Sequence, residues 1–413
     1  MQRVAMRSAR RLAATPMRPM CSRGASLRLA SSAGAGAATS RASMRGAASV
    51  VGAMGLLAAA WTSLALAETK PEEPEVEAAE AAKPIKKATN TLKLFCGNSN
   101  LPLAREVAKH LECEIGQATV TKFEDGEVNV MVHENVRGKD VYIIQPTCTP
   151  VNENLMELML MISTMRRASA RKITAVIPYY GYARQDRKMT ARVPISAADV
   201  ARLLEAMGVD RVVAVDLHCG QIQGFFGPRV PVDNLDGGTV GVKYFGTKGL
   251  HNPVVVSPDA GGVYRAKKFR EGLAKMHGVE AGLAMIIKQR NKPGEVERMD
   301  LVGSVNDSDV IIVDDMIDTA GTLCKAAAEL KNHGARNVYA FASHGIFSGP
   351  AATRISGSEL EEVCITNTIP LSKAFDEVEK VKVLSVGKLI AGAIRRIHEK
   401  KSVSALFSDD SGY

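Results

Sequence analysis

Short apolar runs alternate with helical patterns along most of the chain from residue 91 onward. The clearest run is Val310 to Val313, four β-branched residues in succession, which is typical of a strand buried on both faces of a parallel sheet. Similar runs predict strands at Leu92–Phe95, Val141–Gln145, Ile173–Pro178, Arg211–Val215, Val254–Val256, Ala284–Ile287, Val338–Ala342 and Val363–Asn367. The alternation predicts an α/β fold with central parallel sheets.

The helical patterns and the spacing of the strands predict how the chain is divided. Helices are expected at Leu103–Leu111, Leu155–Ala168, Leu323–Asn332 and Val386–His398. Val120–Phe123 and Val128–His133 flank an acidic turn with an Asp-Gly pair, which predicts a hairpin. The repetition of strand and helix predicts two similar lobes, residues 91–235 and 236–413. The last residues, Leu406–Tyr413, are expected to form a tail in which Leu406 and Phe407 are able to dock.

The first 67 residues differ in composition from the rest of the chain. They hold nine arginines and no lysine or acidic residue. Residues 1–46, rich in Arg, Ser and Ala, have the composition of an organelle transit peptide, with the mitochondrion as first choice and the plastid as second. Residues 47–67 are uncharged and long enough to span a bilayer, and both a membrane anchor and a cleavable sorting signal remain open. Residues 68–90, rich in Pro, Glu, Ala and Lys, read as a disordered linker.

Charge and cysteine content exclude several classes of function. Without the nine early arginines, 44 basic residues remain against 44 acidic residues, so the body of the protein is formally neutral. The basic net charge of the whole sequence therefore does not indicate a nucleic-acid partner for the body of the protein. The seven cysteines are an odd number without C-x-x-C spacing, which predicts neither a disulfide framework nor a zinc site.

Acidic and hydroxyl-bearing residues directly follow the Val310–Val313 run. In order they are Asp314, Asp315, Asp318, Thr319, Ala320, Gly321 and Thr322. The last four form a small loop that opens a helix, whose free N–H groups can receive an anion. The plainer interpretation is an ordinary turn with Asp318 or Thr319 as the helix cap. So many polar residues directly after a buried strand favour a phosphate site at the sheet edge.

Other predicted strands also end in polar residues. The segment 179–194 combines aromatic and cationic residues suited to holding a base and a polyphosphate. Asp216 and His218 follow Arg211–Val215 and could converge on a metal ion, with Asp233 available further on. Asp259 precedes a glycine pair after Val254–Val256. Lys288 and Arg290 follow Ala284–Ile287, and alone they would be read as surface cations.

From Thr91 to Phe407 the chain resembles the family of ribose-phosphate pyrophosphokinases, also called phosphoribosyl pyrophosphate synthetases. The resemblance rests on an ordered set of motifs: FEDGE at 123–127, YARQDRK at 182–188, VDLH at 215–218, QIQGFF at 221–226, SPDAGG at 257–262, VDDMIDTAGT at 313–322 and HGIFSGPA at 344–351. Any one of these could arise by chance, whereas the ordered set is very specific.

The resemblance implies transfer of the diphosphoryl group of MgATP to the anomeric hydroxyl of ribose 5-phosphate, giving phosphoribosyl pyrophosphate and AMP. Such chemistry needs cations and metal more than a protein nucleophile. The implied residues are, for ATP, Phe123, Asp125, Glu127, Arg184, Gln185 and Asp186; for magnesium, Asp216, His218, Asp233 and Asp259; for ribose 5-phosphate, Asp314, Asp315, Asp318, Thr319, Ala320, Gly321 and Thr322; and for catalysis, Lys288, Arg290 and His218. A homo-oligomer, a hexamer built from dimers, is also implied, without nucleic acid and with possible membrane association through residues 47–67.

Two departures from the family pattern change the expectations locally. Residues 227–232 read GPRVPV, where the family commonly has an Asp directly after the paired Phe, so a second metal contact there is not carried over. Tyr264 stands where relatives often carry Lys, which predicts weaker anion contacts. Two alternatives remain: a phosphoribosyltransferase, which the ATP-side residues Phe123 and Arg184 argue against, and a non-catalytic regulatory subunit, which the intact segment 184–197 argues against.

Overall fold

The computed structural model describes residues 91–289 and 298–407. The predicted transit peptide, hydrophobic segment and linker, residues 1–90, lie outside this part of the chain. Within the described residues, no helix is long and apolar enough to cross a membrane.

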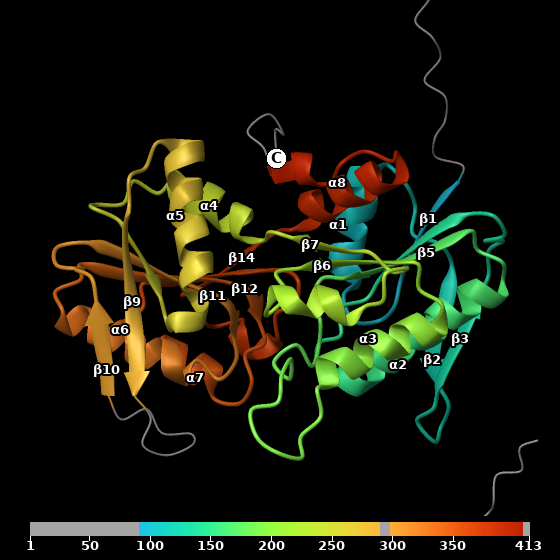
Figure 1. The fold of residues 1–413 in the computed structure, drawn as a ribbon, viewed down its shortest axis with the longest axis horizontal. Helices are drawn as coiled ribbons and strands as arrows, with labels where there is room; N and C mark the ends of the chain where they lie inside the picture. Colours follow the sequence, from blue (N-terminus) through green and yellow to red (C-terminus); the bar gives the residue numbers. More distant parts are fainter. Residues whose placement is uncertain (1–90, 290–297, 408–413) are drawn as a thin grey trace, which may run out of the picture. The chain divides into compact units, whose positions relative to one another are not determined.

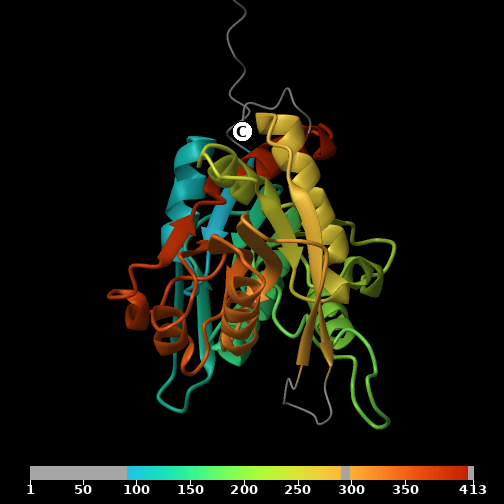
Figure 2. The ribbon, with the colours of Figure 1, turned by 90° about the vertical axis from the view of Figure 1, so that its left-hand side faces the viewer.

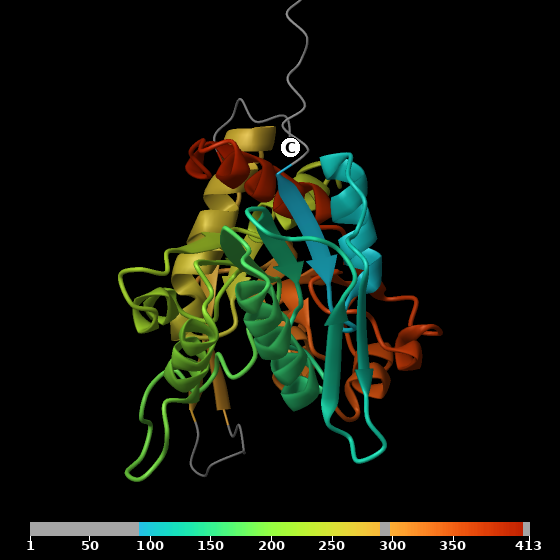
Figure 3. The ribbon, with the colours of Figure 1, turned by 90° about the vertical axis from the view of Figure 1, so that its right-hand side faces the viewer.

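The first sheet is parallel, and its five strands lie in the order β1-β4-β5-β6-β7. They are β1 (Leu92–Cys96), β4 (Asp140–Ile144), β5 (Lys172–Ile177), β6 (Arg211–Val215) and β7 (Val232–Leu235). The helices α1 (Leu101–Leu111) and α8 (Gly387–His398) cover one face, and α2 (Val151–Arg167) and α3 (Ser196–Met207) cover the other (Figure 1). A separate antiparallel hairpin, β2 (Ala118–Lys122) and β3 (Val128–Val132), lies beside α2 (Figure 3). The predicted hairpin is thereby confirmed.

The second sheet has seven strands in the order β10-β9-β8-β11-β12-β13-β14, and only β10 runs antiparallel to its neighbour. They are β8 (Val254–Ser257), β9 (Gly282–Gln289), β10 (Arg298–Val302), β11 (Asp309–Ile317), β12 (Asn337–Gly345), β13 (Glu362–Thr366) and β14 (Val381–Leu384). The helices α4 (Gly238–Gly246) and α5 (Val263–His277) lie on one face, and α6 (Gly321–Asn332) and α7 (Ala351–Ser356) on the other (Figures 1 and 2). The predicted α/β fold with two central, mostly parallel sheets is confirmed.

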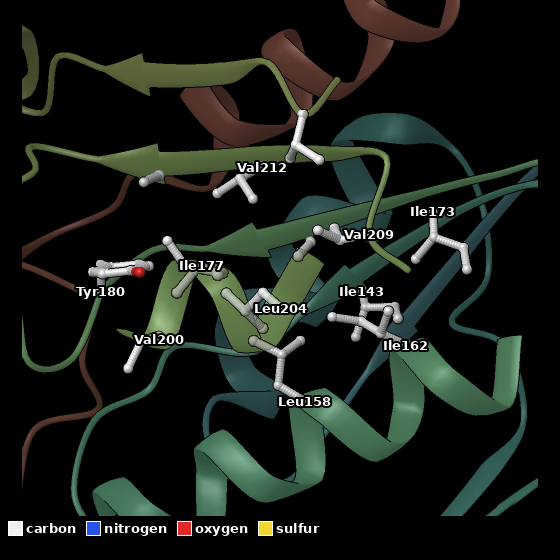
Figure 4. Close-up of a cluster of buried hydrophobic side chains, with 14 of the residues drawn as sticks. Ile143, Leu158, Ile162, Ile173, Ile177, Tyr180, Val200, Leu204, Val209 and Val212 are labelled. Carbon is white, nitrogen blue, oxygen red and sulfur yellow. The ribbon is translucent and has the colours of Figure 1, made fainter. Parts of the chain in front are cut away.

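Each central strand is apolar throughout because its alternate side chains fill two different cores. In β4, Val141 and Ile143 join the core beneath α2 and α3, whereas Tyr142 and Ile144 join the core beneath α1 and α8. Figure 4 shows Ile143 of this strand together with Leu158 and Leu204 from the covering helices. Full burial of each such aliphatic side chain contributes about 1.5–3 kcal/mol, so both cores stabilise the strand.

The strand β11 follows the same rule and is longer than predicted. Val310 and Ile312 join one core, and Ile311 and Val313 join the other. The strand continues to Ile317, so Asp314 and Asp315 lie within it, although the sequence placed them just beyond its end. Pairing with β12 runs as far as Ile317 opposite Gly345, which keeps the two acidic residues in the extended conformation.

Several elements were not predicted from the sequence, among them α3, α4 and α5. In α5 only Ala266, Phe269 and Leu273 are buried, and the remaining positions are mostly charged or polar. This narrow apolar stripe is too weak a periodic signal among so many cations. The missed helix matters, because its first turn carries residues of the functional site.

The end of the chain returns to the first sheet. Arg395 of α8 donates from Nη2 to the carbonyl oxygen of His110 at 2.6 Å. Leu406 is buried and Phe407 packs against the same core, so both residues dock. Because residues after 236 also cover the first sheet, the division into lobes at 235/236 stays a prediction.

Candidate functional site

A cavity of about 1010 Å³ lies where β6, β8 and β11 deliver the polar residues that follow or end these strands. Its wall includes the proposed site residues Asp216, His218, Asp259, Asp314 and Asp315. In parallel sheets the carboxyl ends of strands meet at one edge, which explains why residues almost a hundred positions apart converge here.

The acidic pair Asp314 and Asp315 is held by two cationic partners. Nδ1 of His218 lies 2.7 Å from Oδ2 of Asp315. Nη1 of Arg265 lies 3.4 Å from Oδ1 of Asp315 and 3.5 Å from Oδ1 of Asp314. These contacts join β6, α5 and β11 in one charged network at the cavity wall.

The two carboxyl groups of this pair have opposite pKa shifts. Burial, followed by the neighbouring charge of Asp315, raises the pKa of Asp314. Burial alone would also raise the pKa of Asp315, but the hydrogen bond from His218 and the charge of Arg265 hold it well below its usual range. The same hydrogen bond raises the pKa of His218. Asp315 is therefore the ionised member of the pair, and His218 is stabilised in its protonated form.

Asp216, directly after β6, is fixed by Gly237 at the start of α4 and by two residues of β12. Its Oδ2 accepts hydrogen bonds from the amide of Gly237 at 3.0 Å and from the hydroxyl of Ser343. Its carbonyl oxygen lies 3.2 Å from Nε2 of His344. Burial, followed by the charge of Asp236, raises the pKa of Asp216. Two adjacent residues of β12 therefore position the loop that carries Asp216 and His218.

His344 is a fully buried, neutral histidine. Its Nε2 donates to the carbonyl oxygen of Asp216, and its Nδ1 lies 2.9 Å from the hydroxyl of Thr368, which itself donates to the carbonyl oxygen of Ser343 at 2.9 Å. Burial lowers the pKa of His344 to about 4. Both ring nitrogens have partners inside the protein.

The lowered pKa of His344 predicts that the folded protein loses stability in acid. The unfolded chain binds a proton near the ordinary histidine pKa, whereas the folded chain does not until about pH 4, so the free energy of unfolding falls as the pH falls through this window. Between about pH 7 and about pH 5, the wild type should lose about 2 kcal/mol more than His344→Gln does. Urea unfolding at both pH values measures the difference. His251→Gln, at an exposed histidine, serves as control, and equal pH dependence in wild type and His344→Gln would contradict the prediction.

The proposed metal ligands are only partly brought together. Asp216, His218 and Asp259 line the same cavity, and Oδ1 of Asp259 also accepts from the amide of Gly262 at 3.1 Å. Asp233 does not line this cavity. It lies in β7 and forms an ion pair with Arg211 of the neighbouring strand β6. Within residues 91–289 and 298–407, no three His, Cys, Asp or Glu side chains are arranged as a complete metal site. Oxygen atoms from a substrate would have to complete the coordination of any metal ion here.

The predicted phosphate loop lines a second, smaller cavity of about 190 Å³. Its wall contains Asp318, Thr319, Ala320, Gly321 and Thr322 together with Asp314. The helix α6 begins at Gly321 after Ala320, which has φ 57°, and no side chain caps it. The plainer interpretation, with Asp318 or Thr319 as the cap, is therefore wrong. Nη1 of Arg184 lies 2.6 Å from Oδ2 of Asp318, which joins the 179–194 segment to this loop.

The other residues predicted to bind ATP lie outside both cavities. Phe123 is 56% exposed at the tip of the β2–β3 hairpin, where Oδ1 of Asp125 accepts from the amide of Glu127 at 3.0 Å. Gln185 accepts from the hydroxyl of Ser196 at 2.5 Å. The Asp186 carboxylate contacts Arg187, and that hydrogen bond lowers the pKa of Asp186 to about 2. Of this segment, Arg187 lines the large cavity.

The two proposed catalytic cations, Lys288 and Arg290, lie at the end of β9 or just after it. Lys288 belongs to β9, next to Ile287 of the cavity wall, but its side chain and all of Arg290 lie outside the described residues. The ion pair between Lys268 Nζ and Asp236 Oδ2, at 2.7 Å, also lines the large cavity and was not predicted, because α5 was missed.

The chain matches known proteins over most of the described residues. Residues 92–208 match the N-terminal domain of ribose phosphate pyrophosphokinase, and residues 276–408 match the phosphoribosyl synthetase-associated domain. A Helicobacter pylori protein named ribose-phosphate pyrophosphokinase is 50% identical over 327 residues, covering 79% of this chain and 99% of the relative. A protein of the same name from Shewanella oneidensis is 52% identical over 318 residues, covering 77% and 99%.

A solved structure gives the same result. The crystal structure of phosphoribosylpyrophosphate synthetase from Mycobacterium smegmatis superimposes with a TM-score of 0.70 at 40% sequence identity. The match covers 75% of this chain and 99% of the other.

Proposed function

The chain belongs to the ribose-phosphate pyrophosphokinase family, and from this premise we propose how its residues divide the work between donor, metal and acceptor. The protein is an enzyme that forms phosphoribosyl pyrophosphate and AMP from ATP and ribose 5-phosphate. The observation that carries the division is the cavity into which β6, β8 and β11 bring His218, Asp259 and the Asp314–Asp315 pair.

The acceptor is proposed to bind along β11 and the loop that follows it. The uncapped first turn of α6, with the loop 318–322, offers amide groups to the 5-phosphate. Asp314 and Asp315 face the adjoining large cavity and accept hydrogen bonds from the ribose hydroxyls. The anomeric hydroxyl would then point into the large cavity, because Asp314 lines both spaces.

The donor is proposed to bind on the side of β6 and the 179–194 segment. Arg184, Gln185 and Asp186 would contact the nucleotide, and Phe123 would stack on the base with Asp125 and Glu127 nearby. The exposure of Phe123 away from the cavities supports a homo-oligomer, such as a hexamer built from dimers, in which the hairpin tip meets another copy. Light scattering of the purified protein measures this state.

Magnesium is the proposed cofactor, held by Asp259 and by His218 once its second ring nitrogen has lost its proton, with Asp216 as a further candidate. The carboxylate oxygens and the imidazole on one cavity wall fit a cation that takes its other ligands from phosphates. When bound, the ion would neutralise charge on the phosphates of ATP. Lys288 and Arg290 are proposed to stabilise the charge that builds on the transferred group.

Substrate dependence tests the proposed function. Purified protein with ATP, ribose 5-phosphate and magnesium should release AMP, and omission of the sugar or addition of a chelator should stop the release. Free purine and pyrimidine bases added with phosphoribosyl pyrophosphate test the phosphoribosyltransferase alternative. Activity only after addition of a second, active synthetase would instead indicate a regulatory subunit.

The amino-terminal residues are proposed to direct the enzyme to an organelle, the mitochondrion first and the plastid second. The support is the arginine-rich composition of residues 1–46, which contain no acidic residue. Sequencing the mature amino terminus of protein from fractionated organelles would test this and would show whether residues 47–67 are retained.

A further inference from the structure

We propose that Arg265 is a positioning residue for the sugar-phosphate site, where its guanidinium aligns the two carboxylates that receive the ribose hydroxyls. The inference rests on the proposed function of Asp314 and Asp315. Arg265 lies in the first turn of α5, and its Nη1 reaches Oδ1 of Asp314 at 3.5 Å and Oδ1 of Asp315 at 3.4 Å. One nitrogen atom therefore contacts both acceptor carboxylates.

The acidic pair needs such a partner because of its surroundings. The side chain of Asp315 is 5% exposed, so water compensates little of its charge, and that of Asp314 is 34% exposed. His218 contacts Asp315, with Nδ1 2.7 Å from Oδ2 of that carboxylate. Arg265 therefore holds the Asp314 carboxylate beside that of Asp315, together with the amide of Asp315, which donates to Oδ1 of Asp314 at 2.9 Å.

The neighbouring lysines of α5 are engaged with other carboxylates. Lys268, one turn later on α5 and also on the cavity wall, forms an ion pair with Asp236 at 2.7 Å. Lys267 lies on the exposed side, 3.6 Å from Glu271. An arginine also suits the position better than a lysine, because a planar guanidinium fixes the direction of its donors whereas an ammonium group does not.

The contact also orients the donor side indirectly. Asp315 accepts from both Arg265 and His218, so a carboxylate freed from Arg265 can rotate and carry His218 with it. The primary effect is nevertheless expected on the acceptor, because both contacted carboxylates belong to the proposed ribose site. A simple salt bridge that only stabilises α5 would show no such preference for one substrate.

Binding measurements on the full-length protein distinguish these roles. Arg265→Ala should raise the Kd of ribose 5-phosphate, measured by calorimetry without ATP, by about tenfold or more. The Kd of MgATP should change by less than about threefold. Arg265→Lys should recover part of the loss. Lys267→Ala, on the same helix, is the matched control and should bind both substrates as the wild type does.

Chemical rescue adds a readout that a purely structural contact would not give. Millimolar guanidinium ion should restore part of the sugar-phosphate affinity of Arg265→Ala without affecting Lys267→Ala. Unchanged ribose 5-phosphate affinity in Arg265→Ala, or an equal loss of affinity for both substrates, would overturn the inference. Turnover by the wild type would still support the proposed function in that case. If the wild type forms no product, but Arg265→Ala still weakens its binding of ribose 5-phosphate selectively, the proposed function would be overturned and the role of Arg265 would stand.

Discussion

His218→Ala should lower kcat/KM by about a hundredfold to a thousandfold, because the imidazole serves two parts of the site at once. The change removes a proposed magnesium ligand, and it also removes the 2.7 Å partner of the buried Asp315 carboxylate. Steady-state kinetics with both substrates, together with thermal unfolding, measures the effect.

The matched control for this variant is His251→Ala. His251 is half exposed and lies 3.5 Å from Asp307, outside the cavity wall. It should retain wild-type kinetics. A His218→Ala protein with nearly wild-type turnover would refute the assignment of His218, whereas a loss that follows unfolding would show only a structural role.

Lys288→Ala should lower kcat by about a hundredfold without changing the stability of the fold. Removal of a cation that stabilises charge in the transition state typically lowers kcat by about a hundredfold. The KM values should change little if Lys288 contacts the transferred group mainly in the transition state. The backbone of β9 is held by β8 on one side and β10 on the other, so truncation of one side chain near its end should leave the strand intact.

A second lysine provides the control for Lys288. Lys382 is exposed in β14, at the far edge of the second sheet, and Lys382→Ala should have wild-type kcat. Equal effects of the two substitutions would indicate a general charge effect, and unchanged kcat in Lys288→Ala would remove this lysine from the catalytic assignment.

The parts of the site that were predictable from sequence are those that follow strands or lie near their carboxyl ends. His218, Asp259, Asp314 and Asp315 could be placed together because parallel strands bring their carboxyl ends to one edge, and all four line one cavity. The small loop before α6 was predictable for a local reason, since Thr319 to Thr322 directly precede a helical pattern, and the structure shows no side-chain cap there. These predictions needed no knowledge of the strand order.

The parts that were not predictable depend on tertiary contacts. The link between Asp216 and Ser343, and that between Arg265 and the acidic pair, join residues from different elements whose proximity follows from the sheet order and from a helix with a weak apolar stripe. Asp233 looked equally suitable as a ligand, but its register beside β6 pairs it with Arg211. The extension of β11 likewise came from pairing with β12, which local sequence does not reveal.

Isotope transfer follows the movement of the diphosphoryl group from ATP to ribose 5-phosphate. With ATP labelled at the β-phosphate, the label should leave the nucleotide and appear in phosphoribosyl pyrophosphate, with AMP formed in equal amount. Label that stays on the nucleotide as ADP would show transfer of the γ-phosphate alone and would rule out the diphosphoryl transfer.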